Sequence, residues 1–333
     1  MNQTLTLLTS TNWYRLINLI KIRISYLLSR LTGSVFVWGA PPAMSFEISG
    51  KCQLHCPECH LGSKKQGERG NMSFTLFESV IHDQRHNLWV VNLYFQGEAL
   101  LHPGFDKFIA LLEKHNIYSV ISTNGNFSDP EIAERLVRAG LKKLIVSVDG
   151  SSQQEYEKYR RGGSLEKVLI FINHVKQAKQ KLKQKYPVIV MQSLVMKHNE
   201  NSIEKFKNMA SELKVKLQLK SVQINHPESI DLLPEKSRYR RYEIKNGKAV
   251  LMNPLRNHCW RLYRNPVITS EGDVLPCCFD KSLKYTMGNL YTQKFSEIWH
   301  SQAYYNFRKQ VFTNRKNIDI CRNCSEGTKH IYV

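Results

Sequence analysis

Between residues 44 and 225, apolar runs of strand length alternate with segments of helical period. The runs are rich in β-branched and aromatic residues with little polar interruption, which is typical of strands buried on both faces of a parallel sheet. They predict strands at 43–49, 88–95, 118–123, 143–148, 187–196 and 217–224. In the third helical segment, Ser128 or Asp129 should cap the start and Gly140 should follow the end. Six strand–helix repeats predict an α/β fold, either an open doubly wound sheet or a partial barrel.

The first 42 residues have a different pattern. No Asp or Glu occurs before residue 47, and apolar residues alternate with basic ones at helical spacing, which predicts an amphipathic basic helix. The segment carries too many charges to span a bilayer and lacks the apolar core and cleavage site of a signal peptide. Two interpretations stay open: residues 13–31 either pack on the main domain or lie on an anionic membrane surface. The apolar positions are Trp13, Leu16, Ile17, Ile20, Ile24, Leu27, Leu28 and Leu31.

The strand–helix rhythm stops after residue 225. Residues 226–256 contain prolines and charges without a period, and they are predicted to be a linker with a hairpin that turns at Asn246-Gly247. The remainder is loop-rich, with a second hairpin signal in TSEGDVLPC, 269–277. The predicted domains are an N-terminal segment, 1–42, a partial barrel, 43–225, a linker, 226–256, and a small C-terminal domain, 257–333.

Composition narrows the class of protein. The chain has 333 residues, of which 42% are hydrophobic, so it can bury a sizeable core. Its formal net charge of +20 attracts anions, but it fits a nucleic acid, an anionic membrane and a phosphorylated substrate equally well. The basic stretches with tyrosines could contact RNA, yet no recognisable nucleic-acid module is present, so a solvated surface and no specific nucleic acid are expected.

The eight cysteines fall into two groups with about two hundred cysteine-free residues between them. Disulfide frameworks belong to short secreted chains, whereas tight cysteine clusters in a long, lysine-rich chain indicate metal ligands in a reducing compartment. The protein is therefore expected to be cytoplasmic.

Polar residues and glycines gather where the predicted strands end. The first strand is followed by CQLHCPECHLG, 52–62, and the second by QGEALLHP, 96–103, while the third ends in STNG, 122–125, and the fourth in SVDG, 147–150. Active sites of parallel α/β folds form at the carboxyl ends of the strands, and glycine lets the backbone approach a ligand closely. Four such ends predict one ligand spread across the rim.

The first loop contains three thiols, Cys52, Cys56 and Cys59, at C-x3-C-x2-C spacing. A structural zinc needs a fourth ligand, and the adjacent Cys-His pair that His60 would complete is a poor tetrahedral clamp. Iron–sulfur clusters are usually held by four thiolates, so three thiolates leave one iron open to a substrate or cofactor. With Gly97 and the acid after it at the second strand end, this spacing resembles the radical S-adenosylmethionine (SAM) superfamily.

The resemblance implies a partial (β/α)6 barrel and a specific chemistry. In that superfamily the open iron chelates the amino and carboxylate groups of SAM. The reduced cluster breaks the sulfonium C–S bond, and a 5′-deoxyadenosyl radical removes a hydrogen atom from the substrate. The partner that this chemistry implies is a reducing electron donor of the flavodoxin or ferredoxin type.

The same resemblance assigns roles around the first loop. The three thiols would ligate the catalytic 4Fe-4S cluster, and Glu98, beside Gly97, would hold the SAM ammonium by a charge-assisted hydrogen bond. The alternative for Glu98 is an ordinary acid at a helix N-terminus. Glu58 departs from the family, which commonly has an aromatic residue before the third cysteine, and this leaves the local packing open.

Further residues resemble the family's contacts to the ribose and the carboxylate of SAM. They are Ser122 and Asn124 after the third strand and Ser147 after the fourth. Arg160 resembles the arginine that pairs with the cofactor carboxylate, and Arg161 is nearly as good a candidate. Capping and turn roles are the alternative for these polar residues.

The second cysteine group resembles the SPASM extension in its shorter Twitch form, which holds one auxiliary 4Fe-4S cluster. The matching positions are Cys259, Gly272, Cys277, Cys321 and Cys324. Four thiolates would saturate the cluster, which suits electron transfer better than direct binding of substrate. A zinc ribbon is the alternative, since two cysteines and a C-x2-C pair also make a tetrahedral site.

One thiol, Cys278, is left over. We hypothesise that it lines the active site, either as a hydrogen-atom donor that quenches a substrate radical or as a small packing residue. Asp280, two residues further on, is the candidate for the general base that some relatives carry directly after this ligand.

Three functions are compatible with these features. The protein could dehydrogenate or epimerise a small polyol, sugar or lipid headgroup, or it could modify the side chains of a peptide or protein. The single auxiliary cluster and the basic N-terminal helix favour the first. A non-catalytic iron–sulfur scaffold or electron carrier is the third, and Glu98 argues against it because a carrier needs no SAM site.

Overall fold

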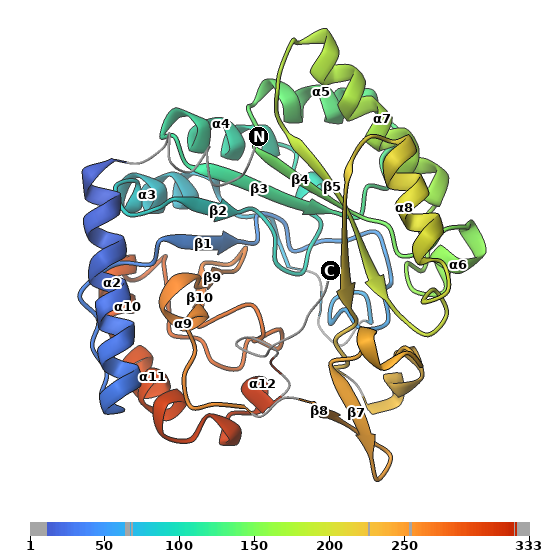
Figure 1. The fold of residues 1–333 in the computed structure, drawn as a ribbon. Helices are drawn as coiled ribbons and strands as arrows, with labels where there is room; N and C mark the ends of the chain where they lie inside the picture. The colour runs from blue at the N-terminus through green and yellow to red at the C-terminus, as the bar shows by residue number, and fades with distance from the viewer. Residues whose placement is uncertain are drawn as a thin grey trace. The chain divides into compact units, whose positions relative to one another are not determined.

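The computed structural model describes residues 12–63, 67, 69–225, 227–252, 255–322 and 324 (Figure 1). Their contacts divide the chain into two compact units, each built from segments far apart in the sequence. The first unit contains the described residues of Met1–Gly50, Arg69–Val120 and Leu255–Gly327, and the second those of Lys51–Glu68 and Ile121–Pro254. The C-terminal segment therefore belongs to the same unit as the N-terminal helix and the first strand.

The first unit contains a mixed sheet. Its strand order is β11 (Gly288–Asn289), β10 (Asp273–Leu275), β9 (Val267–Ile268), β1 (Ala43–Phe46), β2 (Val90–Asn92) and β3 (Tyr118–Thr123), the last of which continues past Val120 into the second unit. β9, β1, β2 and β3 run parallel to one another, whereas β10 pairs antiparallel with both of its neighbours, β9 and β11. The helices are α2 (Trp13–Thr32), α3 (Phe74–Gln84), η1 (Ala99–Leu101), α4 (Phe105–Lys114), α9 (Arg261–Arg264), α10 (Phe295–Trp299), α11 (Gln302–Asn314), η4 (Arg315–Asn317) and α12 (Asp319–Arg322).

Aromatic side chains form the core between this sheet and α3 and α4. Phe46 of β1 meets Phe77 of α3 edge-on, with ring centroids 4.8 Å apart, and Phe77 lies 4.8 Å from Phe108 of α4. All three are fully buried. Edge-on aromatic contacts add to the hydrophobic gain from burial, so they hold the helices on this face of the sheet.

The second unit repeats the strand–helix pattern. Strands β4 (Lys143–Ser147), β5 (Val188–Val195) and β6 (Lys216–Ser221) run parallel in this order, and β7 (Tyr242–Lys245) and β8 (Lys248–Leu251) form a separate hairpin. The helices are α5 (Pro130–Arg138), α6 (Gln153–Glu157), α7 (Leu165–Lys181), α8 (Ile203–Glu212), η2 (Pro227–Leu232) and η3 (Ser237–Tyr239).

The strand–helix order predicted from the pattern is confirmed, although all of the predicted strands except β3 are shorter than the apolar runs. The run at 88–95 contains only the three strand residues of β2, Val90–Asn92. Asp129 caps α5, and Gly140 adopts a φ of 85° just after its end. Both predicted hairpins are present, and Asn246 and Gly247 both take the positive φ that a tight hairpin turn requires.

The N-terminal helix α2 packs on the first unit through polar side chains. Arg15, which is 2% exposed, donates from its guanidinium to the carbonyls of Arg85, His115 and Asn116 at 2.7–3.0 Å. Arg85 and His115 are the C-caps of α3 and α4, so one buried cation satisfies the ends of two helices. The expected amphipathic helix is confirmed, but its packed face is the polar one.

We predict that Arg15→Met lowers the free energy of unfolding by about 3 kcal/mol, because it leaves buried carbonyls at two helix ends without donors. Arg30→Met is the matched control, since Arg30 lies on the same helix with an exposed side chain. The measurement is anaerobic urea unfolding of the two variants followed by circular dichroism. Equal stability of both variants would contradict the role given to Arg15.

Candidate active site and cluster-binding loops

The loop with the first three cysteines packs on an apolar cluster of the second unit. Cys56 is buried in this cluster, and Cys52 and Cys59 lie against it. The other buried members are Leu54, Tyr159, Met196, Val222, Ile224, Leu233 and Tyr242. Because Met196 follows β5 and Val222 follows β6, the three thiols lie near the ends of these two strands, which the strand-end pattern did not include.

Two N–H donors point at the sulfur atoms of this loop. Arg160 Nη1 lies 3.8 Å from Cys56 Sγ, and Asn124 Nδ2 lies 3.8 Å from Cys52 Sγ. Burial raises the pKa of the Cys56 thiol, and the Arg160 cation opposes this by favouring the thiolate. Three thiols with N–H donors aimed at two of them are a donor set that fits an iron–sulfur cluster, whose thiolates are stabilised by such bonds.

Arg160 is held in place by a buried acid. Its Nε lies 2.5 Å from Asp149 Oδ2, and the other carboxylate oxygen of Asp149 accepts from the backbone N–H of Leu194 at 2.6 Å. Burial lowers the pKa of Arg160, but Asp149 and then Cys56 outweigh it and hold the pKa well above its usual value. Arg161 has an exposed side chain, and its backbone carbonyl accepts from the N–H of His55 in the thiol loop at 3.0 Å.

The structure also places the polar residues that follow β3 and β4. Asn124 exchanges side-chain hydrogen bonds with Gln53 of the cysteine loop, at 3.1 and 3.4 Å. Ser122 is half-buried near the end of β3, and Ser147 is the buried last residue of β4. The cofactor contacts expected of Ser122, Asn124 and Ser147 stay predictions. Gln53 was not recognised from the sequence, since a lone glutamine in a loop carries no signal.

Glu58 fastens the loop to the segment that follows β6. Its side chain is buried, and one carboxylate oxygen accepts from the backbone N–H of Asn225 at 2.5 Å, while Asn225 donates from its side chain to the carbonyl of Glu58 at 3.2 Å. Where the family commonly packs an aromatic ring, this chain uses a polar clamp. The sequence departure at Glu58 therefore corresponds to a difference in local packing, in which hydrogen bonds with Asn225 stand in place of an aromatic ring.

In the first unit, the turn with Gly97 and Glu98 follows β2. Glu98 is buried and caps η1, because one of its carboxylate oxygens accepts from Leu100 N at 3.2 Å. A Cβ atom at Gly97 would stand 1.9 Å from the carbonyl oxygen of Ser49, so no other residue fits there. The expected role of Glu98 toward SAM stays a prediction.

A buried ion pair holds this turn, and it was not recognised from the sequence. Glu47, just after β1, makes a salt bridge with Arg69 at 2.7 Å, and both side chains are buried. The Glu47 carboxylate also accepts from the backbone N–H groups of Gln96 and Gly97 at 3.3 Å. The available signal was an acid inside the otherwise apolar run AMSFEIS.

The ion pair also lies beside the two short chain segments, at Gly50 and at Arg69 and Gly70, through which the cysteine loop leaves and re-enters the first unit. We call these two segments the neck. Gly50 N donates to Gly70 O at 3.0 Å and Arg69 N donates to Gly50 O at 3.1 Å, so the two arms of the neck pair like strands. A Cβ atom at Gly50 would lie 2.5 Å from the Cβ of Arg69. The neck therefore depends on both the glycine and the ion pair.

The C-terminal cysteines line one cavity of the first unit. Cys259, Cys277, Cys321 and Cys324 are all buried there among apolar side chains such as those of Leu262 and Phe307. No three His, Cys, Asp or Glu side chains in the described part of the chain are close enough together to hold a single metal ion. A 4Fe-4S cluster separates its thiolates more widely, because the irons and sulfides stand between them.

Two arginines, Arg261 and Arg315, line this cavity, and Arg315 is the buried one of the two. It is 2% exposed, and its Nη2 lies 3.5 Å from Cys324 Sγ. Burial raises the pKa of Cys321 to about 11 although Arg315 opposes it, and Arg315 in turn has a raised pKa because the thiols of Cys259, Cys324 and Cys321 outweigh its burial. Four thiols beside one buried arginine fit an anionic iron–sulfur cluster.

The leftover thiol, Cys278, faces a polar patch at the end of β2. Arg261 Nη1 lies 3.5 Å from Cys278 Sγ. Burial raises the pKa of Tyr94 to about 12, and the neighbouring Cys278 adds to the rise while Arg261 and Arg264 oppose it. Tyr94 follows β2, which ends at Asn92, whereas Arg261 and Arg264 precede the start of β9 and Cys278 follows β10.

Asp280 is fully buried, and its carboxylate is occupied by the backbone. Its two oxygens accept from Lys284 N at 2.9 Å and from Tyr285 N at 2.8 Å, and its own N–H donates to the carbonyl of Cys277. Burial raises its pKa, and the two backbone donors oppose this rise. The contacts hold the turn that follows Cys277, and the general-base role stays a prediction.

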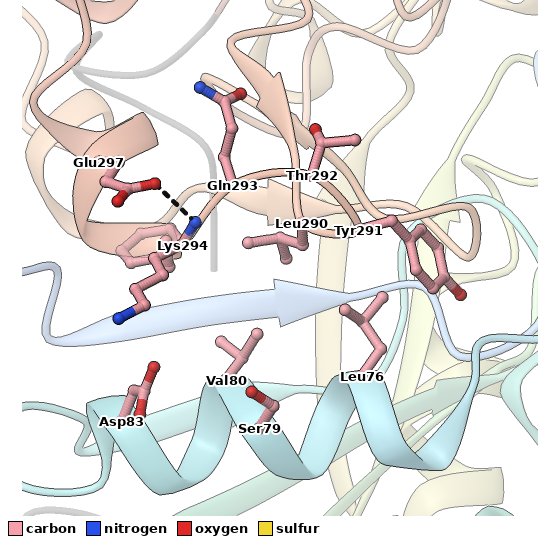
Figure 2. Close-up of a pocket in the computed structure, with 11 residues that line it drawn as sticks. Leu76, Ser79, Val80, Asp83, Leu290, Tyr291, Thr292, Gln293, Lys294 and Glu297 are labelled. Carbon is pink, nitrogen blue, oxygen red and sulfur yellow. Dashed lines mark hydrogen bonds between the residues drawn. The ribbon is translucent and has the colours of Figure 1, made fainter.

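Figure 2 shows a separate cavity of the first unit, between α3 and the segment 290–297 that leads into α10. Leu76, Val80 and Asp83 line it from α3, and the N–H of Lys294 donates to Glu297 at its opposite wall. It contains no cysteine and none of the predicted site residues, so it is not part of the cluster chemistry.

Comparison with known families defines the class of protein. Residues 46–218 match the radical SAM superfamily, which covers more than half of the chain, and the chain belongs to this superfamily. Residues 259–325 match the SPASM iron–sulfur cluster-binding domain. The predicted fold class is thereby confirmed as an α/β radical-SAM partial barrel with a C-terminal SPASM-type domain, and the cofactors are SAM, a catalytic 4Fe-4S cluster and an auxiliary 4Fe-4S cluster.

Individual relatives share the length of the chain at low identity. A SAM-dependent 2-deoxy-scyllo-inosamine dehydrogenase of Niallia circulans is 23% identical over 288 residues, which cover 84% of this chain and 90% of that protein. The crystal structure of BtrN with AdoMet and 2-DOIA aligns with a TM-score of 0.52 at 18% identity, covering 86% of this chain and 94% of the other. Streptococcus suis SuiB bound to the precursor peptide SuiA aligns with a TM-score of 0.65 at 14% identity, covering 91% and 74%.

We predict that Gly97→Ala abolishes SAM binding while both clusters still assemble, because the added methyl group pushes the turn away from Ser49. Gly104→Ala is the matched control, since its Cβ would meet nothing nearer than 3.6 Å. Iron and sulfide content test cluster assembly, and equilibrium dialysis with labelled SAM tests binding. Normal SAM binding by Gly97→Ala would contradict the close approach at this turn.

Proposed function

We propose that this protein dehydrogenates or epimerises a small polyol, a sugar or a lipid headgroup at a carbon that bears a hydroxyl group. When bound, SAM and the catalytic cluster supply a 5′-deoxyadenosyl radical that removes the hydrogen atom from this carbon. In a dehydrogenation the substrate radical would lose the proton of its hydroxyl group and one electron to become a ketone, and an auxiliary cluster held by Cys259, Cys277, Cys321 and Cys324 would supply the acceptor for that electron. The relative that acts on a cyclic amino-polyol, and of which this chain covers 90%, supports the substrate class.

Different residues of the chain take different roles in binding the cluster and SAM. Arg160 and Asn124 stabilise the thiolates of the first loop, since each places an N–H donor 3.8 Å from a cysteine sulfur. Glu98 binds the ammonium of SAM, and Glu47 acts as a positioning residue because it holds the N–H groups of Gln96 and Gly97 just before Glu98. This division follows from where each side chain lies in its own unit.

The observation that carries the oxidative function is the Arg315 site. A saturated cluster with four thiolates is a net anion in both redox states, and it becomes more negative on reduction. A buried cation within hydrogen-bond distance of its ligands stabilises the reduced state more than the oxidised state, and so it raises the reduction potential. A raised potential adds driving force for accepting an electron from a substrate radical.

Cys278 supports the epimerisation branch. Its thiol is half-buried beside Arg261 and near Tyr94, the second residue after β2. A thiol there would return a hydrogen atom to the substrate radical from its S–H bond and leave a thiyl radical, which the external reductant and a proton restore. In the dehydrogenation branch Cys278 only packs. Asp280 holds the turn behind it and is better placed to position Cys277 and Cys278 than to accept a proton from substrate.

The partners follow from the chemistry. Reductive cleavage of SAM needs a low-potential electron donor, for which a flavodoxin or ferredoxin is the fitting class. We further propose that the protein works in the cytoplasm at a membrane surface, where residues 13–31 contact the lipid, and that nucleic acid is not its ligand.

The test of this function is anaerobic turnover of the holoprotein with dithionite, SAM and a panel of cyclitols and sugars deuterated at carbon. We expect 5′-deoxyadenosine even without substrate, and deuterium in 5′-deoxyadenosine with the right substrate. A ketone formed in equal amount indicates dehydrogenation, and an inverted carbon that incorporates solvent hydrogen indicates epimerisation.

Three outcomes of the same experiment would overturn parts of the proposal. No 5′-deoxyadenosine from protein with both clusters loaded would indicate a scaffold or electron carrier. Deuterium transfer only from a labelled peptide would indicate the alternative enzymatic function, the modification of side chains in a peptide or protein. Unchanged product and stereochemistry in Cys278→Ser would exclude the thiol as hydrogen-atom donor.

A second prediction concerns Arg315. Arg315→Met should lower the reduction potential of the auxiliary cluster by about 50 mV or more, because the buried charge and its N–H donor are lost. Arg322→Met is the matched control, since Arg322 lies next to Cys321 but its side chain is exposed and solvent screens its charge. The readout is an EPR-monitored redox titration, and equal potentials in both variants would contradict the role of Arg315.

A further inference from the structure

Helix α2 exposes its apolar face. Six large apolar side chains, each between 38% and 80% exposed, recur at intervals of three or four residues and fall within about 80° of the helix circumference. They are Trp13, Leu16, Ile20, Ile24, Leu27 and Leu31, and we call them the α2 stripe. A surface helix of a globular domain normally turns such a stripe toward the core. This helix turns it away.

The opposite face of α2 explains this orientation. It is mostly polar, and its side chains are matched to backbone groups of the first unit. Besides Arg15, Asn18 exchanges two hydrogen bonds with Ala40, at 2.8 and 3.0 Å. Ser25 and Ser29 accept from the backbone N–H groups of Trp38 and Phe36, both at 2.9 Å. Turning the helix around would leave these donors and acceptors buried without partners, so the orientation is enforced by hydrogen bonding.

Basic side chains flank the stripe on both sides. Lys21 lies about 100° from its centre line in one direction, and Arg23 and Arg30 lie about 60–80° in the other direction, all three with exposed side chains. No acid occurs before residue 47 to neutralise them. Long cationic side chains beside an apolar stripe can extend to lipid phosphates while the stripe is immersed.

Exposed aromatic residues accompany the stripe. Trp13 and Tyr14 stand at the start of α2 with more than half of their surface exposed, and Trp38, whose backbone N–H donates to Ser25 in the middle of the helix, is 54% exposed. Tryptophan and tyrosine favour the boundary between headgroups and acyl chains, because an apolar ring and a polar N–H or O–H are both satisfied there. The arrangement of apolar, basic and aromatic side chains is that of an interfacial helix.

We propose that α2 lies in the plane of an anionic lipid bilayer, with the stripe immersed in the outer acyl region and Lys21, Arg23 and Arg30 at the headgroup phosphates. No helix in the described part of the chain is long and apolar enough to cross a membrane, which fits contact in the plane of the surface. A second copy of the chain is a poorer occupant, because a dimer across α2 would bring its basic flanks, on chains of net charge +20, against each other.

This inference gives the membrane contact of the proposed function its residues and its geometry. It favours a substrate that is itself at the membrane surface, such as a lipid headgroup, over a freely diffusing polyol. The docking surface belongs to α2 alone, so it does not depend on the radical chemistry being correct.

The test is anaerobic co-sedimentation of the holoprotein with vesicles of phosphatidylcholine alone and of phosphatidylcholine with phosphatidylglycerol. We expect binding to the anionic vesicles that weakens as salt is added, since the basic flanks act through screened charges. The combined variant Ile20→Ser, Ile24→Ser and Leu27→Ser should bind at least about tenfold more weakly, because three immersed apolar side chains are lost.

A matched control removes three exposed apolar side chains elsewhere. Ile170→Ser, Ile244→Ser and Val250→Ser alter residues that are 37–48% exposed on α7 and on the β7–β8 hairpin. This control should bind vesicles like the natural chain. Lys21→Gln with Arg30→Gln should reduce binding to the anionic vesicles and flatten its salt dependence.

The proposal is overturned if the natural chain does not sediment with anionic vesicles, or if the stripe variant binds as well as the control. A natural chain that is dimeric by light scattering, and that the stripe variant converts to a monomer without vesicle binding, would assign the stripe to a second copy instead. Formation of 5′-deoxyadenosine without lipid should be equal in the natural chain and in all variants. Absence of 5′-deoxyadenosine from all of them would contradict the proposed function but would leave the lipid docking intact.

Discussion

The buried ion pair between Glu47 and Arg69 is the constraint on which the site depends. It stands where the chain leaves β1, enters the cysteine loop and returns, and its carboxylate also holds the backbone of Gly97. Breaking a buried pair by removing one partner typically costs about 3–5 kcal/mol, because the remaining charge has no compensation. One interaction therefore fixes both the neck of the thiol loop and the turn that leads to Glu98.

Both sets include buried thiols, and in both an arginine beside a sulfur atom favours the charged thiolate. Burial among apolar side chains opposes ionisation of a thiol, as the raised pKa values of Cys56 and Cys321 show. Each site includes an arginine beside a sulfur atom, Arg160 at 3.8 Å and Arg315 at 3.5 Å. The difference lies in the second partner. Asp149 neutralises Arg160, whereas backbone carbonyls and thiols surround Arg315, whose charge is left for the cluster.

Helix α2 shows how hydrogen bonding can override an apolar period. The stripe would gain free energy by burial, yet Arg15, Asn18, Ser25 and Ser29 occupy the packed side because each satisfies backbone groups of the unit. The apolar stripe is left exposed as a result. The membrane docking that we propose would give this stripe a partner.

The sequence by itself determined what depends on local pattern. Strand–helix alternation predicted the α/β fold, Asn246-Gly247 predicted a hairpin, and the spacing of the cysteines indicated two iron–sulfur sites, because each of these is encoded in residues close together along the chain. Only the tertiary structure decided the rest. It paired β9 with β1, brought Glu47 to Arg69 and Arg315 to Cys324, placed the Arg160 side chain beside Cys56, and turned the α2 stripe outward. These outcomes depend on which distant groups supply hydrogen bonds and countercharges, and a periodicity along one chain contains no information about such partners.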